Sequence, residues 1–411
     1  MIPTLILAMW LSGLFSFALT GGAIYLGYQW YERSLQYDPV LREMLFRPEF
    51  GNNEPTWLFA LAVLLLVISF SGGPITQLIL RLFTKSEPAA DGLPYTSPRP
   101  RRTQQLLRPD GTELHVEFYG QENAQPMVLT HGWGLDNNEW NYLKRDLSAR
   151  FNLIVWDEPG LGKSQRPVDR NFSLDVFARN LEAVLSLAES VNGDNDKRPA
   201  YLLGHSIGGM TILTFCKLFP EALGTRVKGL ILTHTTYTNP VRTAAGAGFF
   251  TAIEPFIIKP LMWLTISFSP LVWLMNWSSY LNGSMHVSTK LSGFTGNESW
   301  EQLDFMTRFQ LAASPGVIAR GMLGMMDYDA TDVLKTISVP TLVVAASNDI
   351  LTTPEASERI RQEIPHAELV MLSPAGHLGL IEHHERYAEA VTRFATPAAI
   401  PMPERAPGVA V

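Results

Sequence analysis

Two long stretches near the start of the chain contain no charged residue. From Met1 to Trp30 and from Trp57 to Leu80 there is no Lys, Arg, Asp or Glu, and apolar residues dominate both stretches. About 20 apolar residues, rising 1.5 Å each, cross a hydrocarbon layer of roughly 30 Å. The pattern therefore predicts two helices that span a membrane.

The flanks of these stretches agree with a membrane location. Trp30, Tyr31 and Trp57 are aromatic residues of the kind that gather at the headgroup region. Gly72–Pro74 interrupts the second stretch, which predicts a kink, or an early end that leaves a helix in the interface. A cleaved signal peptide fits less well, because the apolar run begins at Ile2 without a basic region. Two buried helices of a soluble protein fit less well too, because both runs are so uniformly apolar.

Basic residues near the two stretches predict the side of the membrane on which the rest of the chain lies. Five basic residues follow the second stretch, whereas the connecting loop has three. Cytoplasmic segments carry an excess of Lys and Arg. We therefore expect a multi-pass membrane protein with the lipid bilayer as a partner and the remaining domain in the cytoplasm. The five are Arg81, Lys85, Arg99, Arg101 and Arg102, and the three are Arg33, Arg42 and Arg47.

Beyond residue 105 the hydrophobic pattern changes to short aliphatic runs that alternate with amphipathic helical stretches. This alternation predicts an α/β fold, with a mostly parallel sheet flanked by helices. The first run alternates between polar and apolar residues like an edge strand, the next five are continuously apolar like buried strands, and the last is a short strand. The expected strands are Leu114–Tyr119, Pro126–Thr130, Leu153–Trp156, Tyr201–Leu203, Gly229–Thr233, Thr341–Ala346 and Glu368–Leu372.

Changes in composition predict the domain boundaries. Pro, Ser and Arg dominate residues 85–102, and Pro and Ala alternate after Thr396. Between about Tyr237 and Gly324 several prolines interrupt an aromatic-rich stretch, which predicts an inserted helical cap. The expected parts are a membrane anchor at 1–84, a linker at 85–105, a core in two parts at 106–236 and 326–396, the cap at 237–325, and a disordered tail at 397–411.

Charge and cysteine content exclude several classes of function. A net charge of −7 and a pI near 5.8 give no basic field, which argues against nucleic acid as a partner. A single cysteine, Cys216, can form neither an internal disulfide nor a multi-thiolate metal site. A metal cluster built from His366, His383 and His384 is the less favoured interpretation of those residues. We therefore predict no metal and no cofactor.

The segment Gly204-His205-Ser206-Ile207-Gly208 follows an apolar strand directly and precedes a helical stretch near Met210. A serine on such a sharp turn needs small residues two positions away on each side, because a Cβ there collides with the backbone. Gly204 and Gly208 meet that need. The helix N-terminus also offers N–H groups to a developing oxyanion. The pattern predicts Ser206 as a nucleophile.

A second donor to an oxyanion is expected from the loop after the preceding strand. His131-Gly132-Trp133-Gly134 lies just past the strand that ends at Thr130. We expect the backbone N–H groups of Trp133 and Ile207 to form the oxyanion hole, with Gly132 allowing close approach. The alternative interpretation is a simple glycine-rich turn.

The acid and base partners are expected after later strands. Asp349 follows the strand that ends at Ala346, and His377 follows the last short strand in Pro374-Ala375-Gly376-His377. The chain order Ser, Asp, His is the one used on this kind of strand–turn–helix scaffold. Rival acids Asp327, Asp329 and Asp332 precede their strand and are less favoured. A separate segment, Gly162-Lys163-Ser164, has the ending of a phosphate-binding loop. It is not such a loop, because Asp157 stands where the motif requires a glycine.

From about Leu106 to Phe394 the chain resembles the α/β-hydrolase superfamily. The resemblance rests on the turn at Ser206, the His131-Gly132 loop, the Asp157–Ser164 turn, Val339-Pro340-Thr341 leading to Asp349, and Gly376-His377. It implies a serine hydrolase that works through an acyl-enzyme. The anchor and cap are similar to the arrangement of membrane-bound monoacylglycerol lipases and related esterases.

The cap predicts the kind of substrate. Aromatic and aliphatic residues crowd it, so a lipophilic carboxylic ester is the expected partner, although these residues could simply pack the cap on the core. Other acyl or C–C bond hydrolysis (thioesterase, amidase, perhydrolase) and a non-catalytic binding module are the alternatives. Serine in place of a carboxylate disfavours dehalogenase and epoxide hydrolase chemistry. The crowding residues are Phe249, Phe250, Phe256, Trp263, Phe268, Trp273, Met275 and Trp277.

Overall fold

A computed structural model describes residues 2–51, 53–83, 97–191 and 198–396 of the chain. Its centre is an eight-stranded sheet with strand order β10-β9-β8-β7-β5-β6-β4-β3. All neighbouring strands from β10 to β6 run parallel, and β4 and β3 are antiparallel to their neighbours. The strands are β3 (Arg102–Leu107), β4 (Glu113–Tyr119), β5 (Gln125–Thr130), β6 (Phe151–Trp156), β7 (Ala200–His205), β8 (Val227–Thr233), β9 (Thr341–Ala346) and β10 (Glu368–Leu372).

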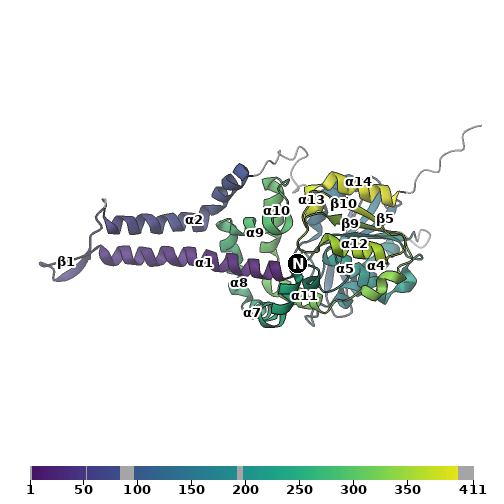
Figure 1. The fold of residues 1–411 in the computed structure, drawn as a ribbon, viewed down its shortest axis with the longest axis horizontal. Helices are drawn as coiled ribbons and strands as arrows, with labels where there is room; N and C mark the ends of the chain where they lie inside the picture. Colours follow the sequence, from purple (N-terminus) through teal and green to yellow (C-terminus); the bar gives the residue numbers. More distant parts are fainter. Residues whose placement is uncertain (1, 52, 84–96, 192–197, 397–411) are drawn as a thin grey trace, which may run out of the picture.

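Helices cover both faces of this sheet (Figure 1). One hydrophobic core lies between the sheet and α4, α5 and α12, and a second core lies on the opposite face under α3 and α14. The sequence predicted this fold class, an α/β-hydrolase fold with a mostly parallel sheet, and the structure confirms it. These helices are α3 (Asn141–Leu147), α4 (Leu174–Val191), α5 (Ile207–Leu218), α12 (Pro354–Glu363) and α14 (His384–Ala395).

The cap lies between β8 and β9 in the chain, and from residue 247 to residue 326 its regular elements are all helical. It lies at one end of the sheet in Figure 1, between the core and the N-terminal helices. Its helices are α6 (Ala247–Ile253), the π-helical turn η4 (Glu254–Ile258), α7 (Lys259–Ser267), α8 (Ser269–Leu281), α9 (Ser284–Gly293), α10 (Trp300–Ala312) and α11 (Pro315–Met326).

The two N-terminal helices pack side by side and project away from the cap (Figure 1). They are α1 (Ile2–Arg33) and α2 (Glu54–Phe83), and the hairpin of β1 (Leu35–Asp38) and β2 (Glu43–Phe46) joins them at the distal tip. Helix α2 bends at Ser71, next to the predicted Gly72–Pro74 interruption, and so the kink is confirmed and the early end is not.

Three helical stretches within the described residues are long and apolar enough to cross a membrane. They are Leu5–Arg33, Glu54–Leu80 and Ala247–Ser267. The first two correspond to the predicted spans, whereas the third is part of the cap. That third stretch contributes Ile258 and Met262 to the hydrophobic core, where both are fully buried.

Two details of the predicted core are wrong. The strand at 114–119 is not an edge, because β3 pairs with β4 on its outer side and the side chains of 114–119 are buried. The predicted linker at 85–105 therefore ends too late, since β3 begins at Arg102. Polar, exposed side chains such as Thr103 and Gln105 gave this strand no hydrophobic pattern in the sequence. The rest of the linker up to residue 96, and the tail at 397–411, lie outside the described residues.

Candidate active site

The carboxyl ends of the parallel strands all meet at one edge of the sheet. His131 follows β5, Ser206 follows β7, His234 follows β8, Asp349 follows the end of β9, and His377 lies on the loop after β10. This edge is where open α/β sheets bind their ligands. The topology therefore brings together side chains that are up to 246 positions apart, from His131 to His377.

Ser206 stands on a strained turn between β7 and α5. Its backbone has φ 54° and ψ −115°, a left-handed region that non-glycine residues rarely occupy. A Cβ on Gly204 would lie 2.4 Å from the backbone of Gly208, and one on Gly208 would lie 2.2 Å from the carbonyl oxygen of Thr130. Both glycines are thus required by the close approach of the backbone, as the motif predicts.

The three predicted triad side chains form a chain of hydrogen bonds. His377 Nε2 lies 3.0 Å from Ser206 Oγ, and His377 Nδ1 lies 2.8 Å from Asp349 Oδ2. All three residues are buried. With Nδ1–H donating to the carboxylate, Nε2 is left to accept the serine proton.

Asp349 is held as a carboxylate by several donors. Its Oδ1 accepts the backbone N–H groups of Leu351 (2.7 Å) and Thr352 (3.0 Å), and its Oδ2 accepts the Thr352 hydroxyl (2.8 Å). Burial by itself raises the pKa of Asp349. The charge of His377 and its hydrogen bond lower this pKa by a larger amount, so that it falls to about 2. The group is therefore ionised throughout the neutral range.

Burial lowers the pKa of His377 below the usual value of 6.5, and the neighbouring Asp349 carboxylate only partly opposes this effect. A neutral imidazole is the form that accepts a proton from a serine hydroxyl. The site thus holds His377 in the protonation state that general-base chemistry needs near neutral pH.

Two further histidines converge on the backbone carbonyl of His377. His234 Nδ1 lies 2.9 Å from this oxygen and His205 Nε2 lies 3.2 Å from it. The other ring nitrogen of His205 contacts the buried carboxylate of Glu139. Burial and the adjacent His205 lower the pKa of His234 to about 3, so His234 is a neutral donor here. These contacts fix the loop that carries His377, and no spacing in the sequence predicted them.

The predicted oxyanion loop is fixed by contacts on both sides. The backbone N–H of Gly132 donates to Glu139 Oε2 (2.8 Å), and the ring of His131 bridges the Gly132 carbonyl and the Glu158 N–H, at 2.8 and 2.9 Å. The Trp133 indole donates to the Ile318 carbonyl in the cap (3.0 Å). Glu139 therefore links the loop that carries Trp133 to His205, the residue before Ser206.

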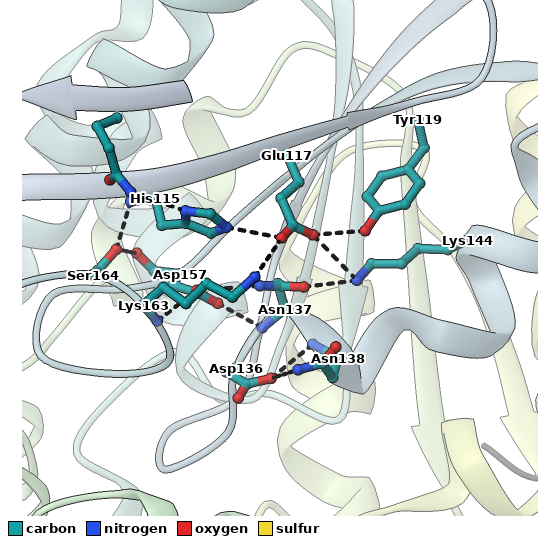
Figure 2. A network of polar contacts seen from close by, with 11 residues as sticks. His115, Glu117, Tyr119, Asp136, Asn137, Asn138, Lys144, Asp157, Lys163 and Ser164 are labelled. Carbon is teal, nitrogen blue, oxygen red and sulfur yellow. Dashed lines mark hydrogen bonds and ion pairs between the residues drawn. The ribbon is translucent and has the colours of Figure 1, made fainter. Parts of the chain in front are cut away.

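A network of polar side chains holds the segment that follows this loop, at Asp136–Asn138 (Figure 2). Asp157 accepts the backbone N–H groups of Asn137 (2.7 Å) and Lys163 (2.9 Å), which ties the segment after the oxyanion loop to the Asp157–Ser164 turn. Gly162 has φ +51° and a Cβ there would meet the Asp157 carboxylate, which agrees with a tight structural turn. Lys144 donates to the Asn137 side chain (2.7 Å) and lies 3.9 Å from Glu117.

A pocket of about 120 Å³ lies beside Ser206 and His377. Its wall is mostly apolar and comes from the core, the cap and, unexpectedly, the first turns of α1. A site of this composition suits an apolar group next to a reacting carbonyl. The apolar lining residues include Leu5, Ile6, Met9, Met306, Ile318, Met322, Leu351 and Leu378.

The rival acids lie elsewhere. Asp329 accepts the N–H of Thr331 (2.8 Å) at the return from the cap, Asp327 follows the end of α11, and Asp332 is in the 3-10 turn before β9. None of the three has a hydrogen bond to His377 among the described contacts. His384 is buried and stacks on Tyr142, with ring centroids 3.9 Å apart. The described residues contain no cluster of His, Cys, Asp and Glu that could hold a metal ion.

The fold and the strand–turn–helix serine define the class of α/β-fold hydrolases. Residues 125–384 match the family described as alpha/beta hydrolase fold. Because this range is more than half of the 411 residues, the chain belongs to the α/β-hydrolase family. Helices α1 and α2 lie outside the matched range.

The chain is similar in sequence to several proteins that are named as hydrolases. The chain is 24% identical to the pimeloyl-[acyl-carrier protein] methyl ester esterase of Nitrosospira multiformis, covering 69% of this chain and 98% of the relative. It is 24% identical to the putative carbamate hydrolase RutD of Pantoea ananatis, covering 64% and 86%. For Lipase 3 of a Moraxella species the identity is 22%, covering 63% and 73%. These relatives support hydrolysis, and ester cleavage in particular.

Solved structures agree on the fold. A thermophilic esterase from Thermogutta terrifontis has a TM-score of 0.57 and 24% identity, covering 71% of this chain and 97% of that one. An enol-lactonase from Burkholderia xenovorans has a TM-score of 0.55 and 19% identity, covering 71% and 99%. At these identities the likeness concerns the fold alone.

Proposed function

We propose that this protein is a membrane-anchored serine hydrolase that cleaves a carboxylic ester with an apolar acyl group. The observation that carries the proposal is the Ser206–His377–Asp349 chain of hydrogen bonds, at 3.0 and 2.8 Å, beside an apolar pocket. The esterases and the lipase among the relatives support the ester as the bond that is cleaved. The apolar wall supports the acyl group.

The proposed chemistry combines the hydrogen bonds of the triad with the expected oxyanion hole. His377 Nε2 takes the proton of Ser206 as Oγ attacks the ester carbonyl carbon, and the resulting oxyanion accepts the N–H groups of Trp133 and Ile207. His377 then gives its proton to the leaving alkoxide, which departs and leaves an acyl-enzyme. A water activated by His377 attacks the acyl carbon and releases the acid and Ser206. Asp349 keeps Nδ1–H in place and stabilises the imidazolium.

The membrane part of the proposal rests on exposed apolar surface. Helices α1 and α2 project from the cap with large apolar side chains such as Leu11 (66% exposed) and Trp57 (65%) facing outward. The adjoining cap exposes Phe256 (80%) and Trp263 (56%). Such a surface is typical of contact with lipid. We infer that α1 and α2 span the bilayer and that α7 and α8 touch its surface.

The test is hydrolysis of p-nitrophenyl esters, from acetate to decanoate, by the purified full chain and by Ser206→Ala and His377→Ala. We expect activity in the unaltered protein and losses on the order of a million-fold in turnover for Ser206→Ala. Covalent labelling by a fluorophosphonate should follow the same pattern. If Ser206→Ala retains the activity of the unaltered protein, the proposed nucleophile is wrong.

Amides, thioesters and carbamates form the second arm of the test. The relative named a putative carbamate hydrolase makes this arm specific. Turnover of a carbamate or thioester by the Ser206 protein, with none of any ester, would replace the ester proposal by another acyl hydrolysis of the same fold. An absence of turnover and of labelling would favour a binding module.

A further inference from the structure

The first turns of α1 form part of the pocket wall beside Ser206. Leu5, Ile6 and Met9 line the same cavity as Ser206 and His377. Ile6 is fully buried and belongs to the main hydrophobic core. In Figure 1 the start of α1 lies between the cap and the sheet, where the predicted membrane anchor was not expected to reach. Helix α1 therefore belongs to the pocket as well as to the projecting helix pair.

One stripe of α1 is fitted to the cap by specific contacts. Trp10 Nε1 donates to the hydroxyl of Thr265 on α7, at 2.9 Å. Gly13, three residues on, faces Met275 so closely that a Cβ would lie 2.5 Å from its Cε. Ser16, a further three residues on, continues the stripe. The spacing of three keeps these positions on one side of a helix.

Ser16 makes the most buried of these contacts. Its Oγ lies 3.0 Å from the Ser279 hydroxyl on α8 and accepts the side-chain amide of Asn282 at 2.7 Å. Ser16 and Ser279 are fully buried. Small residues and hydroxyls at apolar helix interfaces allow close packing and fix the register of one helix on another. Rotation or sliding of α1 would leave these polar groups without partners in an apolar interface.

We propose that the buried face of the first turns of α1, which carries Leu5 and Met9, belongs to the acyl-binding site, and that these two residues determine the length of acyl group that it accepts. The proposal rests on the proposed function and names the residues that set its substrate range. The fixed register of α1 holds both side chains as a rigid wall. The cavity of about 120 Å³ is small, so a change of a few methylene groups in its wall changes what fits.

The test compares two matched substitutions in the full chain. Leu5→Trp fills the cavity, whereas Leu11→Trp places the same side chain on the exposed side of the same helix. We expect Leu5→Trp to lower kcat/KM for the octanoate ester about tenfold or more, and for the acetate ester less than about threefold. Leu11→Trp should leave both unchanged. Thermal unfolding checks that both variants are folded.

Met9→Ala provides the opposite change. It enlarges the cavity, so the ratio of decanoate to butyrate hydrolysis should rise about fivefold or more relative to the unaltered protein. A chain-length profile that stays unchanged in both Leu5→Trp and Met9→Ala, with both variants folded and active, would overturn the role of α1.

A second measurement does not depend on catalysis. Binding of a fluorescent fatty acid to the Ser206→Ala protein reports the pocket directly, and we expect Leu5→Trp to weaken it about tenfold relative to Leu11→Trp in the same background. If the unaltered protein hydrolyses no ester but the dye responds in this way, the proposed ester chemistry fails and the pocket wall stands. Equal binding in both variants would reject the wall.

Discussion

At His377 the side chain and the backbone are held by different neighbours. Asp349 orients the ring, and the side chains of His205 and His234 approach the carbonyl oxygen of the same residue, at 3.2 and 2.9 Å. In the proposed mechanism the His377 imidazole has to be in place within a fraction of an ångström, and such positioning requires support for the residue that carries it. The three contacts supply that support from β7, β8 and the turn after β9.

The protonation of His377 gives a prediction about pH. Because burial lowers its pKa below 6.5 and only the neutral ring accepts the Ser206 proton, activity should persist at pH values where an ordinary histidine is already charged. We expect the acid limb of kcat/KM to have its midpoint below pH 6.5, measured with an ester that does not itself ionise. A midpoint above 6.5 would show that Asp349 outweighs burial.

Glu158 gives a prediction about stability and pH. Its side chain is fully buried beside Thr211, and burial raises its pKa from 4.5 to about 7. A raised carboxyl pKa contributes stability below about pH 4.5 that is lost as the pH rises through 7. Glu158→Gln removes the charge, so its unfolding free energy relative to the unaltered protein should increase between pH 5 and pH 8, by at most about 3 kcal/mol. Denaturant unfolding at both pH values measures this.

A matched control for Glu158→Gln is Glu389→Gln, an exposed position on α14. This control should show a pH dependence smaller than about 0.5 kcal/mol. If the difference between Glu158→Gln and the unaltered protein is the same at pH 5 and pH 8, the raised pKa is wrong.

Among the elements, buried strands followed the sequence most closely. The bounds of the buried strand β9 are the predicted ones, because it is a short aliphatic run between turn residues. The bounds of the edge strand β10 are also the predicted ones. The exposed strand β3 and the β1–β2 hairpin were missed, because polar and charged residues dominate β3 and each hairpin strand is only four residues long. Edge strands can satisfy their outer groups with water, and so their sequences vary more freely.

The site could be predicted only as far as strand ends could be located. Ser206, Asp349 and His377 follow predicted strands, and in a parallel sheet those ends meet. The contacts of His234 and Glu139 lack any characteristic spacing. The docking of α1 was hidden for another reason: a helix that is apolar on all sides gives no stripe to show which face is covered.

The polar network of Figure 2 joins helix α3 to strand β4, and this link gives a prediction about stability. Lys144 on α3 is fully buried, with burial lowering its pKa to about 8, and its nearest carboxylate is Glu117 on β4, 3.9 Å away. Removing Glu117 takes away the strongest of the carboxylate attractions on this buried charge and leaves the weaker ones of Asp157 and Asp136. We expect Glu117→Gln alone to destabilise the protein by about 3 kcal/mol, and Lys144→Met to restore part of this loss in the double variant.

Denaturant unfolding of both single variants and the double variant measures the coupling, which should be about 1–3 kcal/mol. The control pair is Arg359 and Glu363, an ion pair of 2.7 Å on α12 with a half-exposed arginine, for which a coupling below about 0.5 kcal/mol is expected. Equal couplings for the two pairs would mean that the network adds nothing beyond a surface ion pair.

On the scale of the whole molecule, the helix pair separates two exposed regions of the chain. The β1–β2 hairpin lies at the distal tip, and the sheet and cap lie at the other end (Figure 1). If α1 and α2 span the bilayer, the start of α1 and the core lie on one side and the hairpin on the other. The same arrangement brings the pocket wall of α1 close to the lipid surface, where an apolar ester would partition.

Cysteine labelling tests this arrangement, because the native Cys216 is buried and burial raises its thiol pKa to about 12, which keeps it unreactive. Val40 lies in the hairpin and is 87% exposed, and Val168 lies on the surface of the α/β domain and is 69% exposed. Val40→Cys and Val168→Cys are therefore matched probes. With the core in the cytoplasm, a membrane-impermeant maleimide should label Val40→Cys in intact cells, and Val168→Cys only after permeabilisation. Labelling of Val168→Cys alone would reverse the orientation, whereas equal labelling of both in intact cells would mean that the helix pair does not cross the membrane.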